Sequence, residues 1–147
     1  MAGLISLNEF YISSSKVGGY DTAKAFLKAV SDIFYKRTDK VKVYFNSENE
    51  AHIVYLIADN NNLKIEVVAI DDNPFKYIGE QFSSLYFVKK SPPLLIINCD
   101  VSEFALEICK EFRDIIEQNK ESEYEKNWFA FPYAEYYNLF DYFKYRI

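Results

Sequence analysis

The fold is decided by residues 41–70, which read VKVYFNSENEAHIVYLIADNNNLKIEVVAI. Two polar clusters, 46–50 and 59–62, divide this stretch into three apolar runs. Asn and Asp tolerate the left-handed backbone of tight turns, so the stretch predicts an antiparallel meander of three strands. Polar and apolar residues alternate in much of the outer two runs, whereas residues 53–57 are apolar on both faces. The middle strand is therefore expected inside the sheet, covered on both sides or nearly so.

Residues upstream of the meander predict a strand, a loop and a helix. Asp21 is a suitable N-cap, and the apolar residues after it recur at the spacing of one helical face as far as about Lys36. Residues 4–12 predict a strand. Residues 13–19, with three serines and two glycines, predict a loop.

Residues downstream of the meander predict a second helix and a further strand. Asn73 is a cap and Pro74 suits the first helical position, and the apolar residues that follow share one face as far as Tyr86. Residues 94–98, LLIIN, predict a buried strand. We expect this strand to pair antiparallel or, through the preceding helix, in parallel.

The segment after residue 100 predicts a third helix. Asp100 and Glu103 fit a capping box, and an apolar stripe follows as far as Ile116. Residues 119–123, NKESE, then form a polar exit from the helix.

The C-terminal tail is unusually aromatic. Eleven of the 22 residues at 124–145 are Tyr, Phe or Trp. We expect an extended stretch near Trp128 and, beyond Pro132, a helix at about 134–144 that is aromatic nearly all round. One core cannot bury every ring of such a helix, so part of it is expected at the surface.

Together these elements predict an α+β fold. The expected architecture is a mostly antiparallel sheet of about five strands, including the three-strand meander, packed by three to four helices, one of them the aromatic-rich C-terminal helix. The 147 residues fit a single globular domain at 1–147. The apolar runs are strand-sized and the N-terminus lacks a basic signal-like region, so we expect a cytoplasmic protein with no membrane contact and with free thiols at Cys99 and Cys109.

Most enzyme signatures are missing from the sequence. There is no glycine-rich phosphate loop and no Cys-x-x-Cys pair, so we expect no cofactor. His52 is the single histidine and would have to meet a cysteine in space to form a nucleophilic pair. The formal net charge of −5 disfavours binding to nucleic acid.

Four aspartates leave one enzymatic alternative open. They fall at predicted strand ends, where they could converge on a divalent cation in a small metal-dependent hydrolase or nuclease. The same residues also serve as turn formers and helix caps without a metal. They are Asp59, Asp71, Asp72 and Asp100.

Acidic residues and tyrosines indicate a protein-binding surface instead. The acids concentrate in the meander turns and along the third helix with its exit, and rigid tyrosines give large contact area at small entropic cost. We therefore predict a surface for a basic protein partner. Its candidate residues are Glu48, Glu50, Asp59, Asp71, Asp72, Tyr133, Tyr136, Tyr137 and Asp141.

In size, acidic charge and aromatic content, the chain resembles the small immunity proteins that bacteria pair with secreted nuclease toxins. The resemblance implies a non-enzymatic protein without catalytic or metal-binding residues, which neutralises a basic partner through carboxylates that mimic phosphates. A further hypothesis is a structural homodimer that buries the aromatic tail, so both a monomer and a homodimer remain open.

Overall fold

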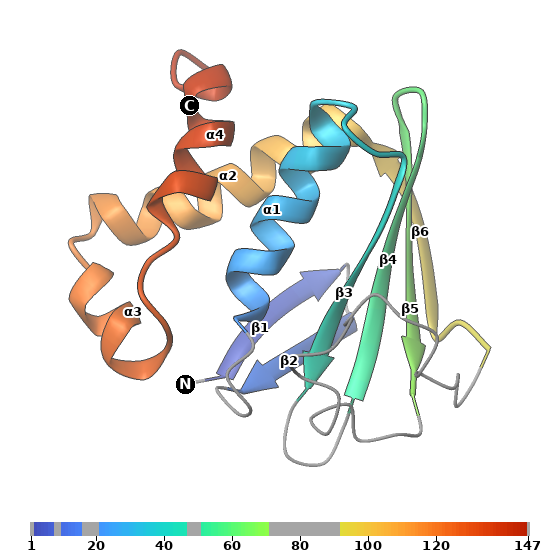
Figure 1. Cartoon of the computed structure of the whole chain (residues 1–147), viewed down its shortest axis with the longest axis horizontal. Helices are drawn as coiled ribbons and strands as arrows, with labels where there is room; N and C mark the ends of the chain where they lie inside the picture. Colours follow the sequence, from blue (N-terminus) through green and yellow to red (C-terminus); the bar gives the residue numbers. More distant parts are fainter. Residues whose placement is uncertain (1, 8–9, 16–20, 47–50, 71–91, 147) are drawn as a thin grey trace.

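The computed structural model of the protein describes residues 2–7, 10–15, 21–46, 51–70 and 92–146 (Figure 1). The fold is α+β, as predicted. Strands β1 (Ala2–Leu7) and β2 (Phe10–Ser15) form an antiparallel hairpin of their own. The expected single strand at 4–12 is therefore wrong, and so is the loop at 13–15. Those three serines pair with residues 2–4 in the strand register, although their composition is typical of loops.

The main sheet contains four antiparallel strands in the order β3-β4-β5-β6. Their bounds are β3 (Lys40–Asn46), β4 (Ala51–Asp59), β5 (Asn62–Ala69) and β6 (Leu95–Asp100). The first three are the predicted meander, and Asn60 takes the left-handed φ of 55° in the turn between β4 and β5.

Strand β6 differs from its prediction in two respects. It pairs antiparallel with β5, so the parallel alternative is wrong. It also lies at the edge of the sheet, and Ile96 is 53% exposed rather than buried. An apolar run of this length is typical of a buried strand, but its position in the sheet decides how many of its faces are covered.

Strand β4 lies inside the sheet, as predicted, but only its helix-facing side is buried along most of its length, because Tyr55 and Ile57 on the other side are partly exposed. Val54 and Leu56 lie in the main core, whereas Ile53 belongs to a second, smaller cluster. The register places Ile53 between Tyr44 of β3 and Val68 of β5, which are the other central members of that cluster.

Two of the four described helices begin at the predicted caps. The side chain of Asp21 accepts the N–H of Lys24 at the start of α1 (Thr22–Phe34), and Asp100 accepts that of Glu103 at the start of α2 (Val101–Glu117). The helix predicted to begin at Pro74 lies outside the described residues.

The polar stretch 119–123 after α2 forms a turn and the start of a helix that was not predicted. Asn119 takes a φ of 55°, which ends α2. The short helix α3 (Glu121–Asn127) follows, and α4 (Tyr133–Phe143) comes after a non-helical stretch around Trp128 and Pro132. The extended stretch and the aromatic C-terminal helix were both predicted.

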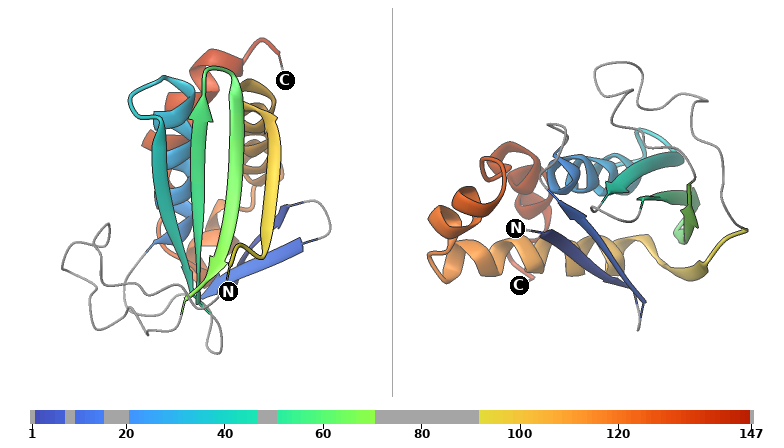
Figure 2. Two further views of the ribbon diagram at one scale, coloured as in Figure 1. Left: turned by 90° about the vertical axis from the view of Figure 1, so that its right-hand side faces the viewer. Right: turned by 90° about the horizontal axis from the view of Figure 1, so that it is seen from below.

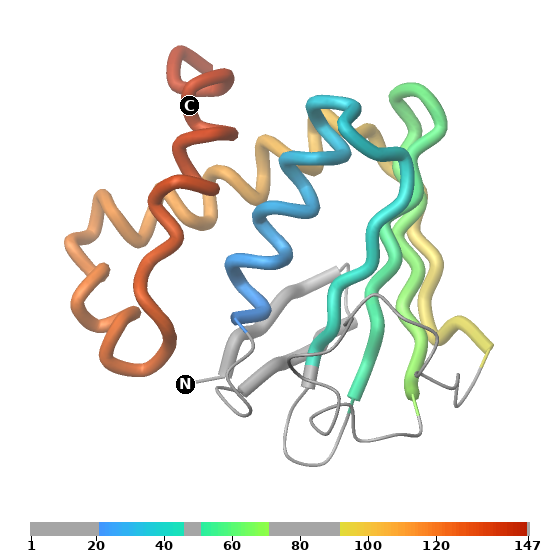
Figure 3. Tube along the Cα trace, in the orientation of Figure 1, coloured from blue at the N-terminus to red at the C-terminus, as the bar shows by residue number. Residues whose placement is uncertain are grey.

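The helices pack on one face of the main sheet. In Figure 1, α1 lies between the sheet and α4, and the left view of Figure 2 shows the opposite sheet face without a helix in front of it. Helices α1 and α4 run side by side, because Lys24 pairs with Glu135 near their starts and Phe34 contacts Phe143 near their ends. Figure 3 follows the chain from β6 along α2 to α3 and back through α4.

One main core joins the sheet to these helices. It includes Leu27 of α1, Leu56 of β4, Ala105 of α2 and Leu139 of α4, all fully buried. Both Cys99 and Cys109 are free thiols, as predicted. Among the described residues, no helix has the length and hydrophobicity needed to cross a lipid bilayer.

Candidate protein-binding surface

The structure describes five of the nine predicted partner-binding residues. The remaining four, all acidic and all next to meander strands, lie outside the described residues. They are Glu48, Glu50, Asp71 and Asp72.

The described residues do not form one continuous surface. Asp59 is exposed at the end of β4, whereas the other four belong to α4. Because α1 lies between α4 and the sheet, Asp59 is separated from the tyrosines (Figure 1).

Tyr136 lies in the core rather than at the surface. Its side chain is 2% exposed, and its ring stacks on Phe140 with 5.3 Å between centroids. Burial is the main cause that raises the pKa of its hydroxyl well above the ordinary value. Tyr136 therefore supports α4 from beneath and presents no contact area to a partner.

Tyr133, Tyr137 and Asp141 occupy an exposed stripe of α4. Their four-residue spacing puts them on neighbouring turns of one helix side. The two tyrosines are 41% and 44% exposed, and their rings stack with 6.4 Å between centroids and 16° between planes. The stripe therefore offers a flat aromatic surface of two adjacent rings.

Helix α3 adds two carboxylates beside this stripe. The hydroxyl of Tyr133 donates to Oε2 of Glu121 at 3.4 Å, and the backbone N–H of Phe131 donates to Oε1 of Glu125 at 3.2 Å. We call Glu121, Glu125, Tyr133 and Tyr137 the tyrosine–carboxylate surface. Glu121 lies in the polar stretch 119–123 and Glu125 just beyond it, but neither was predicted as a partner-binding residue. Their position beside Tyr133 depends on the unpredicted turn between α2 and α3.

Glu121 carries an unsatisfied acceptor. Its Oε1 atom is buried and has no hydrogen-bond partner among the described residues. Loss of solvent around the Tyr133 hydroxyl, followed by the charges of Glu121 and Glu125, raises the pKa of that hydroxyl. The surface is thus electronegative and has acceptor capacity to spare.

Buried aromatic residues hold the tyrosine–carboxylate surface in place. Phe131 is buried between α3 and α4, where its ring contacts Tyr124 with 5.3 Å between centroids. Trp128 is also buried, and its Nε1 donates to Oδ1 of Asp21 at 2.9 Å. The turn between α3 and α4 is therefore attached to the start of α1, and a partner meets tyrosines that are already positioned.

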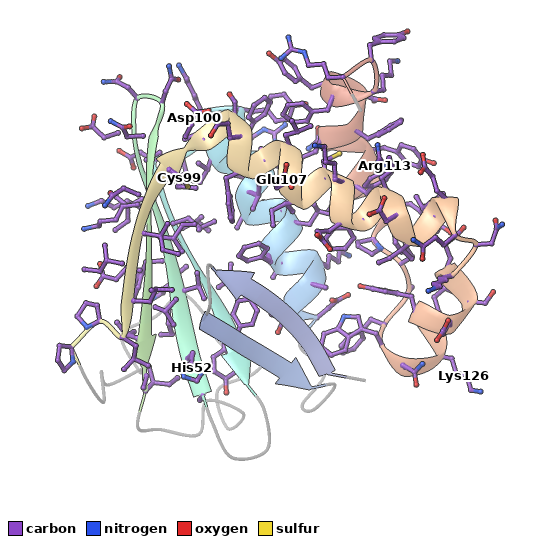
Figure 4. All side chains as sticks on the ribbon, turned by 180° about the vertical axis from the view of Figure 1, so that it is seen from behind. His52, Cys99, Asp100, Glu107, Arg113 and Lys126 are labelled. Carbon is purple, nitrogen blue, oxygen red and sulfur yellow. The ribbon has the colours of Figure 1, made fainter. Side chains whose placement is uncertain are left out.

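A second acidic area lies along the solvent-facing side of α2. Glu103, Glu107 and Glu111 are exposed there at four-residue spacing, as expected for a solvated face. Lys110 interrupts it and pairs with Glu107 at 3.3 Å. In Figure 4, Glu107 and Arg113 are labelled on this helix, with Lys126 beyond them on α3.

The residues of the metal-site alternative do not converge within the described part of the chain. No group of three or more His, Cys, Asp or Glu side chains there could hold a metal ion. Asp59 and Asp100 both pair with Asn62 in the strand register, and the Asp100 side chain caps α2. Asp71 and Asp72 lie outside the described residues.

The structure also separates the residues of a Cys–His pair. His52 pairs with Ala69 at one end of β5, whereas Cys99 pairs with Leu63 at the other (Figure 4). Cys109 is fully buried in the core, and burial raises the pKa of its thiol to about 11. A thiol in that environment is protonated at neutral pH and is a poor nucleophile.

In comparisons with known proteins, no protein-family model matches the chain, and no curated protein or solved structure matches it either.

Proposed function

We propose that the protein is a non-enzymatic binding module that neutralises a basic protein, as an immunity protein against a secreted nuclease toxin. The observation that carries the proposal is the tyrosine–carboxylate surface. It combines two stacked, exposed rings with two carboxylates.

The carboxylate charges of Glu121 and Glu125 favour a cationic ligand group. A lysine or arginine side chain of a partner forms charge-assisted hydrogen bonds with carboxylate oxygens, and these are about twice as strong as hydrogen bonds between neutral groups. The faces of Tyr133 and Tyr137 attract the same cation through their π-systems. The carboxylates and the tyrosine rings of this surface therefore both favour a cationic side chain.

Rigidity supports the proposal as well. Tyrosine has few rotatable bonds, and these two are carried on a helix whose opposite side is buried through Tyr136 and Leu139. Binding therefore costs little conformational entropy at this surface. A surface of this kind fits the centre of an interface that buries about 1,200–2,000 Å² in total.

The experiment that tests the proposal uses a panel of purified, catalytically inactive nuclease domains of bacterial toxins with net positive charge. We expect the wild-type chain to bind at least one of them, and to inhibit the active form of that nuclease. Glu121→Gln and Tyr137→Ala should each weaken the complex by about tenfold or more.

Two matched variants control for charge and for ring loss. Asp39→Asn removes an exposed carboxylate from the segment before β3, and Tyr145→Ala removes a tyrosine that is 90% exposed beyond the end of α4. Both should bind as the wild type does. The proposal is wrong if no basic nuclease in the panel binds, or if the control variants weaken binding as much as Glu121→Gln and Tyr137→Ala.

A further inference from the structure

Strand β6 presents an open edge of the main sheet. On one side it pairs with β5, and on the other side none of the described residues pairs with its backbone. In the left view of Figure 2, β6 forms one margin of the sheet, with α2 behind it. The backbone groups on the free side are available to another chain.

The strand register identifies which residues face the open edge. The N–H of Val101 donates to the carbonyl oxygen of Asn61 at 2.9 Å, and hydrogen-bonding direction alternates along a strand. Cys99 and Ile97 therefore direct their N–H and C=O groups toward β5. Ile96 and Asn98 direct theirs toward the open edge.

The open edge lacks the features that usually prevent strand addition. Natural edge strands commonly carry charged residues, as β3 does with Lys40 and Lys42, and β2 lies beside that strand. In β6 the only charged residue is its last, Asp100, and Ile96 of β6 and Leu94 just before it are exposed on the sheet face without helices. β6 thus combines free hydrogen-bonding groups with exposed apolar side chains.

The charge near this edge distinguishes between two molecules that could pair with β6, a second copy of this chain and a basic segment of a partner. Asp100 and Glu103 lie at the C-terminal end of β6, and the acidic face of α2 continues from them (Figure 4). A second copy that paired antiparallel with β6 across a two-fold axis would place its uncharged residues 94–96 beside Asp100 and Glu103. Such a copy leaves these two acids without a counter-charge, whereas a basic segment supplies one.

We infer that β6 accepts an extended segment of the basic partner as a fifth strand, with cationic side chains of that segment beside Asp100 and Glu103. The inference rests on the proposed function for the basic character of the partner. Hydrogen bonds to Ile96 and Asn98 supply affinity, and contacts with Leu94 and Ile96 supply specificity.

The test compares Asn98→Pro with Asn98→Ala, using an inactive nuclease domain that binds the wild-type chain. Proline removes the outward N–H without removing a bond to β5, and it is tolerated on edge strands for that reason. Alanine shortens the same side chain and keeps the N–H. We expect Asn98→Pro to weaken binding by about tenfold or more and Asn98→Ala by less than about twofold.

Hydrogen exchange on the wild-type complex gives a second measurement that needs no variant. The amides of Ile96 and Asn98 should exchange more slowly when the nuclease is bound. If binding occurs without this protection, and Asn98→Pro binds as Asn98→Ala does, the inference is overturned while the proposed function stands. If the wild type binds no nuclease, both fail. A wild-type dimer that Asn98→Pro dissociates would show that a second copy occupies the edge, which also overturns the inference.

Discussion

The indole Nε1 of Trp128 donates to Oδ1 of Asp21 at 2.9 Å, and the same oxygen accepts the backbone N–H of Lys24 at 3.0 Å. One carboxylate oxygen therefore caps α1 and also attaches the turn between α3 and α4 to it. The two partners are 107 residues apart in the chain.

Removal of the indole donor should destabilise the protein. Trp128→Phe keeps an aromatic ring but loses the hydrogen bond to a charged acceptor, so we expect the free energy of unfolding to fall by about 1.5–3 kcal/mol, with some further loss from the smaller ring. Urea denaturation measures the change. In a double-mutant cycle with Asp21→Ala, the two effects should be strongly non-additive. Additive effects would mean that the contact contributes nothing to stability.

Adjacent tyrosines of α4 should respond very differently to truncation. Tyr136→Ala empties a core position and is expected to cost about 3–5 kcal/mol of unfolding free energy. Tyr137→Ala removes an exposed ring and should cost less than about 1 kcal/mol. Thermal or urea unfolding of the two variants checks this. Similar losses would contradict the placement of Tyr136 in the core and Tyr137 at the surface.

That contrast shows a limit of sequence reasoning. The aromatic helix and its partly exposed position were predicted, but the pattern could not separate Tyr136 from Tyr137. A helix that is aromatic nearly all round has no apolar face of its own. The position of α1 beside α4 decides which rings are buried, and that packing depends on residues more than 100 positions away, such as Tyr35, which donates to the carbonyl of Asn138.

Association with the basic partner should depend on ionic strength through Glu121. Salt screens exposed charges over about 10 Å at 0.1 M, so the association rate constant of the wild type should fall as salt is added. For Glu121→Gln the fall should be less steep, while for Asp39→Asn, which lies before β3 at the opposite edge of the sheet from β6, it should equal that of the wild type. Stopped-flow or interferometric rates measure the slopes. Equal slopes for all three proteins would exclude a role for Glu121 in recognition.

The stability of the protein should fall at alkaline pH because of Cys109. Burial raises the pKa of its thiol from the ordinary value of 9.0 to about 11. Between these values the folded protein keeps the proton and the unfolded chain loses it, so the unfolding free energy decreases as pH rises through this window. Urea unfolding from neutral pH to about pH 11 should show a smaller decrease for Cys109→Ala. Buried tyrosines contribute equally in both proteins, and parallel curves would contradict the expectation.

The two thiols should also differ in reactivity. Cys109 is fully buried, whereas Cys99 lies partly exposed on β6, with its pKa raised by burial and by the nearby charges of Asp100 and Glu103. We expect a water-soluble disulfide reagent to modify Cys99 first in the folded protein, and Cys109 only after unfolding. Mass spectrometry of the modified chain identifies the site. Equal labelling rates in the folded protein would contradict this order.

Local signals predicted the elements well and their surroundings poorly. The caps at Asp21 and Asp100 were evident because capping depends on a few adjacent residues. The edge position of β6 was not evident, because an apolar strand can have the same sequence pattern at the edge of a sheet and in its centre. The tyrosine–carboxylate surface was predicted only in part. Tyr133 and Tyr137 were selected, but Glu121 lies beside them only because the chain turns at Asn119.

The 17 residues of α2 set the spacing of the two proposed contacts. β6 immediately precedes this helix and α3 closely follows it, and a helix of that length measures about 25 Å. A ligand that engages both ends must therefore span about 25 Å, which a folded domain or an extended segment of about eight residues does and a shorter peptide does not. Under the proposed function, the chain would discriminate among basic partners by their dimensions as well as by their charge.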